Sequence, residues 1–216
     1  MEIRFSALSM LAAMAVALFF WLRIPRPKGS VLNLLGVVIL LALPLEIYGY
    51  FSNMREVNNS PVYNFFGLVE SLLILAMMRA LRPQWTSWFL IGAMIIAASF
   101  ILDLLAIPAM DFLFFEMVLV ISLVLSVASM AMLWSMAQEC DVALLRQPMF
   151  VLVMGHLVYF AGMVPIMGMF FFIYQQDQFL AADIFRIVPA LCVVRYLFSA
   201  YACRLQAHQR NIPAHG

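Results

Sequence analysis

An arginine and several carboxylates embedded in long apolar segments are the residues of this chain with the clearest capacity for chemistry. Arg186 lies in the last apolar segment, three residues after Asp183, so the two side chains can pair on one helical face. Other apolar segments contain Glu46, Glu70 and Glu116. A charge at the centre of a bilayer costs roughly 2.5–3.5 kcal/mol on insertion scales, so such residues are usually paired, inward-facing and functional. We therefore expect Arg186 and these acids to line a polar site.

Neutral polar residues accompany these charges. Tyr63 and Glu70 are seven residues apart and share a helical face. His156 is the one histidine within an apolar segment, and either a hydrogen-bonded packing role or a ligand-binding role fits it. The predicted ligand-binding residues are Glu46, Tyr63, Asn64, Glu70, Glu116, His156, Tyr159, Asp183 and Arg186.

The charges of this set restrict what the site can do. Four acids and one arginine cannot all be ionised in a low-dielectric site, so some acids must be protonated, solvated or matched by a bound cation. The sequence lacks the Glu-x-x-His motif of di-iron bundles, H-E-x-x-H and G-x-S-x-G. The only lysine, Lys28, lies outside the last apolar segment, which excludes a retinal Schiff base there. We expect no metal and no cofactor.

All of these residues lie in segments that the sequence predicts to be membrane-spanning helices. The chain has 216 residues, of which 66% are hydrophobic and 11% are charged. Runs of about 20 apolar residues are typical of transmembrane helices, so the sequence predicts an all-α, polytopic membrane protein with short connections. The net charge of +1 argues against a nucleic-acid partner. The seven predicted segments are 5–22, 31–51, 62–80, 85–106, 112–137, 148–173 and 179–203.

Basic residues predict the orientation. One side of the predicted bundle carries Arg23, Arg26, Lys28, Arg79, Arg82, Arg146, Arg204 and Arg210, whereas the other carries Arg4 and Arg55. The positive-inside rule then places the N-terminus outside and the C-terminus in the cytoplasm. We expect a transmembrane domain over residues 1–203 and a polar cytoplasmic tail over 204–216, in a bacterial inner membrane.

Three further positions have simpler predicted roles. Pro189 should distort the last helix, because proline lacks an N–H and clashes with the preceding turn. Arg195 lies half a helical rotation from Arg186, so we expect it to extend toward the cytoplasmic headgroups. Asp103 is close to the end of its segment and is expected to be solvated at the membrane interface.

Short motifs in the third to seventh predicted segments resemble a group of small seven-helix bacterial membrane proteins of unknown function. The motifs are Tyr63-Asn64 with Glu70, an acid early in the fifth segment (Glu116), and Pro148, Phe150, Gly155, Leu157, Tyr159 and Gly162. The last helix of that group often carries His and Asn where this chain has Arg186 and Ala190. The resemblance implies a fold and a polar face, and it implies no activity.

These observations favour a membrane-embedded binding protein over an enzyme. Its outward-facing polar pocket would take a small molecule or a lipid headgroup, and the protein would act as a receptor-like sensor or accessory subunit. Since no soluble output domain is predicted, a sensor would need a protein partner, beside its contact with membrane lipid. Three alternatives stay open: a lipid-modifying enzyme that uses a carboxylate pair such as Glu70 and Glu116, a proton-coupled transporter, and a static polar network that stabilises the bundle.

Overall fold

The chain forms seven long helices and one short one in the part that the computed structural model describes, residues 2–107, 110, 112–139 and 143–211. The long helices are α1 (Glu2–Leu22), α2 (Ser30–Met54), α3 (Ser60–Leu81), α4 (Thr86–Ala106), α5 (Phe115–Gln138), α6 (Pro148–Gln176) and α8 (Ile187–Asn211). The short helix is α7 (Gln178–Phe185), and two 3₁₀ turns, η1 (Pro83–Trp85) and η2 (Leu144–Arg146), precede α4 and α6.

Six of the helical segments are long and apolar enough to cross a membrane. They comprise α2, α3, η1 with α4, α5, α6, and the segment from Asp183 to Arg210, whereas the apolar part of α1, Ser6–Leu22, is shorter. Large apolar side chains such as Leu105 and Val127 are 72% and 68% exposed, as expected for surfaces that contact lipid. Helix length and hydropathy therefore support the prediction of an all-α, multi-pass membrane protein.

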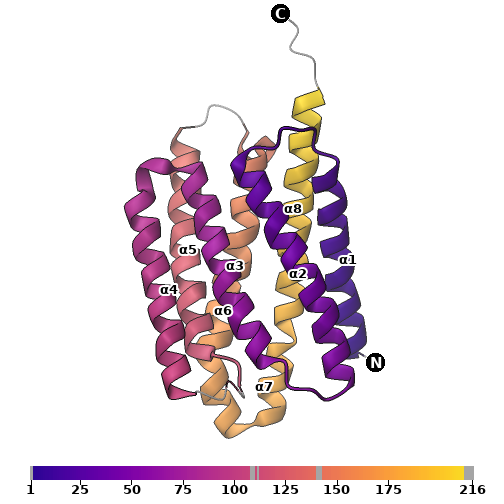
Figure 1. The fold of residues 1–216 in the computed structure, drawn as a ribbon, viewed down its shortest axis with the longest axis vertical. Coiled ribbons are helices and arrows are strands. Elements are labelled where there is room, and N and C mark those ends of the chain that lie inside the picture. The colour runs from indigo at the N-terminus through magenta and orange to yellow at the C-terminus, as the bar shows by residue number, and fades with distance from the viewer. Residues whose placement is uncertain (1, 108–109, 111, 140–142, 212–216) are drawn as a thin grey trace, which may run out of the picture.

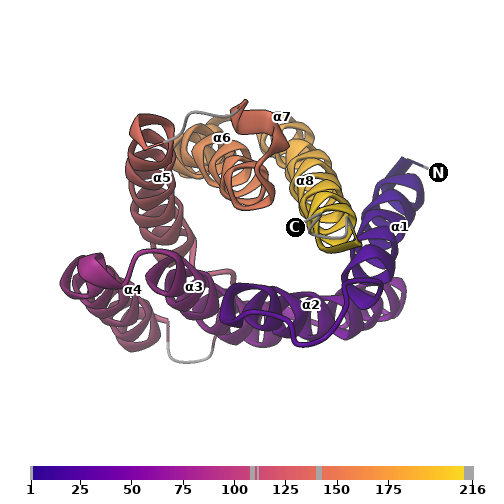
Figure 2. The ribbon, with the colours of Figure 1, turned by 90° about the horizontal axis from the view of Figure 1, so that it is seen from above.

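The helices surround a common interior. Viewed from above, α4, α3 and α2 form one row, while α5, α6 and α8 lie on the other side and α1 lies at the edge beside α8 (Figure 2). Helix α6 packs between α5 and α8, and α1 packs against both α2 and α8. Apolar side chains fill the core, and Met14, Ile39, Ile74, Ile96, Leu125 and Leu152 are fully buried.

The last predicted segment is divided into two helices at Arg186. Pro189 lies in the first turn of α8, where its missing N–H would have no partner in the helix in any case. In a continuous helix, the proline ring would clash with the carbonyl group of Phe185, the last residue of α7. The predicted distortion is therefore confirmed as a helix break. Figure 1 shows α7 at the end of the bundle opposite the C-terminus.

Two glycines of α6 allow α8 to approach closely. A methyl group on Gly162 would lie 2.9 Å from Leu191 Cδ1, and one on Gly155 would lie 2.5 Å from Phe198 Cβ. Small residues at helix interfaces permit such close contact in membrane proteins. This packing fixes which face of α8 is turned toward the interior.

Candidate functional site

A buried ion pair joins α3 to α8. Arg195 Nη2 lies 2.7 Å from Glu70 Oε1, and the two side chains are only 3% and 13% exposed. Glu70 lies about 15 Å from the first residue of α3, at about 1.5 Å per residue, and hence near the middle of the helix. The prediction that Arg195 extends to the headgroups is wrong, because its face of α8 is the one that packs toward α6.

Aromatic rings surround the Arg195 guanidinium. Its central carbon lies 5.0 Å from the ring centroid of Tyr159, 5.3 Å from that of Tyr196 and 5.6 Å from that of Phe160. A cation within about 6 Å of an aromatic ring is attracted by the electron density of the ring face. The rings therefore stabilise the charge of Arg195 where water is excluded, and they restrict the orientation of its guanidinium toward Glu70.

A second carboxylate approaches the same interior from α2. The Tyr63 hydroxyl donates a hydrogen bond to Glu46 Oε2 over 3.1 Å. Glu46 is close enough to Glu70 for their charges to interact. Within the described part of the chain, no basic side chain lies within ion-pair distance of Glu46, in contrast to Glu70. We define Glu46, Tyr63, Glu70, Tyr159 and Arg195 as the interior cluster.

Gly49 makes the contact between Glu46 and Tyr63 sterically possible, because a methyl group there would collide with the Tyr63 hydroxyl. We expect Gly49→Ala to destabilise the protein by about 1–3 kcal/mol, the usual cost of overpacking. Thermal unfolding in detergent measures the effect. Gly168→Ala is the matched control, since open space surrounds that helical glycine and alanine should be neutral or favourable by up to about 1 kcal/mol.

The same measurement in a Tyr63→Phe background identifies the colliding atom. Without the hydroxyl group, Gly49→Ala should cost clearly less than it does in the natural sequence. An equal cost in both backgrounds would contradict the assigned position of the hydroxyl group.

His156 is buried beside this cluster and is partly unpaired. Its Nδ1 lies 2.8 Å from the Leu152 carbonyl oxygen, so a proton on Nδ1 is donated to that oxygen. Its Nε2 has no hydrogen-bond partner among the described residues, and neither do the Ser126 and Ser129 hydroxyl groups of α5. The ring stacks on Phe160 at 6.3 Å, and Phe160 in turn contacts Arg195. His156 therefore presents a free acceptor atom in the bundle interior.

Asn64 holds the connection between α4 and α5. Its side-chain amide donates to the Phe112 carbonyl oxygen over 3.0 Å, and its side-chain oxygen accepts the Phe114 N–H over 2.9 Å. Asp103 acts nearby, where its carboxylate accepts the Met117 N–H over 2.9 Å in the first turn of α5. The prediction of a solvated Asp103 is wrong, since this residue is 8% exposed and caps a neighbouring helix.

The other predicted site residues lie away from the interior cluster. Arg186 Nη1 pairs with Asp183 Oδ1 at 2.9 Å, and both side chains are more than half exposed, at 55% and 61%. Glu116 is exposed in the first turn of α5. The pairing predicted for Asp183 and Arg186 is thus present. The prediction that this pair lies among the interior acids is wrong, because the helix break places Arg186 at the end of the bundle.

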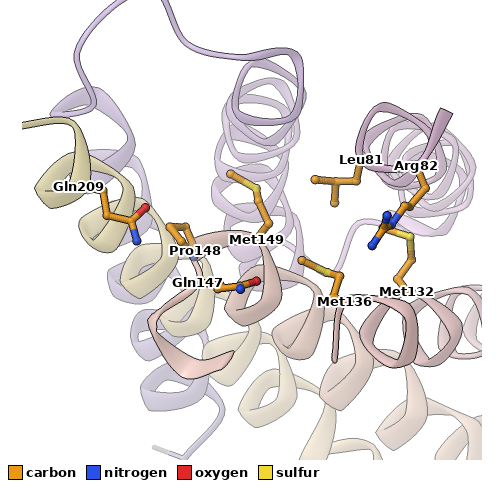
Figure 3. Close-up of a pocket in the computed structure, with 8 residues that line it drawn as sticks. All are labelled: Leu81, Arg82, Met132, Met136, Gln147, Pro148, Met149 and Gln209. Atoms are coloured by element: carbon orange, nitrogen blue, oxygen red, sulfur yellow. The ribbon is translucent and has the colours of Figure 1, made fainter. Parts of the chain in front are cut away.

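A pocket of about 330 Å³ opens at the end of the bundle that carries most of the basic residues. Its lining consists of Leu81, Arg82, Met132, Met136, Gln147, Pro148, Met149 and Gln209 (Figure 3). The Arg82 guanidinium pairs with Glu139 at 2.6 Å and lowers the pKa of that carboxyl. None of the predicted site residues lines this pocket.

Within the described residues, no group of three or more His, Cys, Asp or Glu side chains is arranged to hold a metal ion. Comparisons with protein-family models, curated proteins and solved structures find no match for the chain. Of the resemblance to small seven-helix proteins, the structure supports an all-α chain with six long apolar helices. No family is identified.

Proposed function

We propose that this protein is a membrane-embedded, receptor-like binding protein whose ligand is a positively charged small molecule or lipid headgroup. The ligand would bind at the interior cluster, with Glu46 as its main partner. One observation carries the proposal: the cluster contains two carboxylates, Glu46 and Glu70, but one guanidinium, Arg195.

The charge balance explains why a cation fits. Arg195 neutralises Glu70, whereas the Tyr63 hydroxyl gives Glu46 one hydrogen bond and no charge. An ionised carboxylate removed from water is unfavourable unless it is paired. An amine or quaternary ammonium group would supply the missing positive charge, and Tyr159 offers an aromatic ring of the kind that binds such cations. The alternative is that Glu46 takes up a proton.

Binding at this position would be able to change the arrangement of helices. Glu46 belongs to α2, Glu70 to α3, and Arg195 to α8, so a ligand that draws Glu46 toward itself acts on three helices at once. The described helices and their connections account for the part of the chain that the structure covers, so we propose that a protein partner in the membrane receives the signal. The protein would then be a sensor or an accessory subunit.

We also propose that the connection between α2 and α3 faces the outside of a bacterial inner membrane. The opposite end of the bundle carries eight of the basic residues counted above, which supports this orientation by the positive-inside rule. Glu46, about 12 Å from the last residue of α2, would then lie in the outer half of the membrane.

Cysteine labelling tests the orientation. With Cys140, Cys192 and Cys203 replaced by alanine, we expect Val57→Cys to react with a membrane-impermeant maleimide in intact cells. Gly29→Cys should react only after the membrane is permeabilised. The reverse pattern would contradict the proposed orientation.

Native mass spectrometry of the protein released from gentle detergent tests ligand binding. We expect a defined extra mass in the natural protein and its loss in Glu46→Gln, because the amide keeps the shape of the side chain but removes its charge. Glu116→Gln is the matched control and should retain the extra mass, since Glu116 lies outside the cluster. A bare mass in all three samples would contradict the proposal and favour a static polar network.

A further inference from the structure

The connection between α1 and α2 forms a second pocket, which is lined by cationic and aromatic side chains. Its volume is about 540 Å³, and its lining consists of Trp21, Arg26, Pro27, Lys28 and Asn33. It lies at the end of the bundle opposite Glu46 of the interior cluster, so it is independent of the ligand site proposed above. A pocket with two cations and a tryptophan at the end of a membrane helix has the composition of a site for an anionic headgroup.

Side chains from several elements hold this connection in place. Arg210 of α8 donates to the carbonyl oxygens of Pro25 and Pro27, over 3.1 Å and 2.6 Å. Asn33 donates to the Lys28 carbonyl oxygen over 3.2 Å, and Trp21 Nε1 donates to the Leu32 carbonyl oxygen over 2.6 Å. Because these oxygens are occupied, and two prolines restrict the backbone, the pocket is formed before any ligand arrives.

The two cations of the pocket have no carboxylate partner in the described part of the chain. The Lys28 ammonium lies over the Trp21 ring at 3.4 Å, and Arg26 is exposed. Burial, followed by the charge of Arg26, lowers the pKa of Lys28, so the two cations oppose each other. The described residues of the connections at this end of the bundle include one acidic residue, Glu139. Its carboxylate is already paired with Arg82.

We propose that this pocket binds the phosphate group of an anionic phospholipid through Arg26 and Lys28. A guanidinium donates paired hydrogen bonds to phosphate oxygens, and an ammonium adds a point charge. Trp21 would lie against the glycerol region of the lipid, the usual depth of tryptophan in membranes. A phosphate bound between the two cations would relieve their repulsion. Free phosphate shares this chemistry, so the test must separate the two sources.

The test is a native mass spectrometry titration of the full chain with phosphatidylglycerol and, separately, with phosphatidylcholine. We expect tighter retention of phosphatidylglycerol and a loss of about tenfold or more in its apparent affinity in R26Q/K28Q. The matched control is R23Q/R79Q, which removes two positive charges from the same end outside the pocket, and it should change the affinity less than about threefold. Thermal unfolding checks that both variants fold.

Each outcome of this test decides the proposal. Equal losses of phosphatidylglycerol affinity in both double variants would show that binding depends only on general surface charge, and would overturn the proposal. An unchanged affinity in R26Q/K28Q, or equal binding of the two lipids, would also overturn it. Competition by inorganic phosphate at concentrations similar to the lipid would assign the site to a free anion. Lipid retention that is insensitive to inorganic phosphate would assign it to the phospholipid.

Discussion

Replacing Arg195 with methionine is expected to destabilise the bundle by about 3–5 kcal/mol, the usual cost of leaving one partner of a buried ion pair uncompensated. Glu70, at 13% exposure, would lose its only charged partner among the described residues. Methionine keeps much of the apolar volume of the side chain, so the loss is mainly electrostatic. Thermal and denaturant unfolding in detergent measure the effect.

Two further variants separate charge from packing. Arg186→Met removes an arginine from an exposed pair on the same stretch of chain, and we expect a cost below about 1 kcal/mol. The double variant E70M/R195M removes both charges and should recover most of the stability that Arg195→Met loses. If the double variant were as unstable as Arg195→Met, the aromatic contacts of Arg195 would be more important than its pair with Glu70.

Asn64→Leu is expected to cost about 1–3 kcal/mol for the buried Phe114 N–H that it leaves without an acceptor, with a further contribution from the Phe112 carbonyl group. Leucine has the same branching and number of heavy atoms as asparagine but lacks its hydrogen-bonding groups. Hydrogen exchange localises the effect, since protection should fall at the Phe114 amide and in the first turn of α5 before it falls elsewhere.

Asn53→Ala is the control for this substitution, because Asn53 is exposed near the end of α2. We expect a change within about 0.5 kcal/mol. Equal effects of Asn64→Leu and Asn53→Ala, or no change in exchange at Phe114, would show that Asn64 does not hold the connection between α4 and α5. Asn64 would then be available for the ligand-binding role that the sequence predicts for it.

The helices themselves were largely predictable, because apolar runs of about 20 residues have few alternatives to a membrane span. The predicted segment 31–51 corresponds to α2, and 148–173 corresponds to α6. Pro189 also identified the region of the break between α7 and α8, since the steric effect of proline is local. Properties that depend on one helix at a time were therefore accessible from the sequence.

The sequence did not indicate whether Arg186 or Arg195 is the arginine that points into the bundle. They lie on opposite faces of the last segment, and lipid is as apolar as the protein core, so hydrophobic periodicity does not indicate which face points inward. The rotation of α8 is fixed by its close packing on Gly155 and Gly162 of α6, which is a tertiary contact.

The burial of Asp103 was not predictable from the sequence for a related reason. Its partner is the Met117 N–H at the start of the next helix, and that proximity depends on how the chain turns between α4 and α5. Position near the end of a segment predicted exposure, and the sequence offered no sign of the capping contact.

A crystal structure of the natural protein grown from a lipid mesophase tests the central proposal most directly. We expect electron density that belongs to no protein atom, within hydrogen-bonding distance of the Glu46 carboxylate and near the Tyr159 ring. Glu70 and Arg195 should remain paired beside it. An interior in which Glu46 contacts only Tyr63, with protein side chains filling the surrounding space, would contradict a ligand site and leave the polar residues as a structural network.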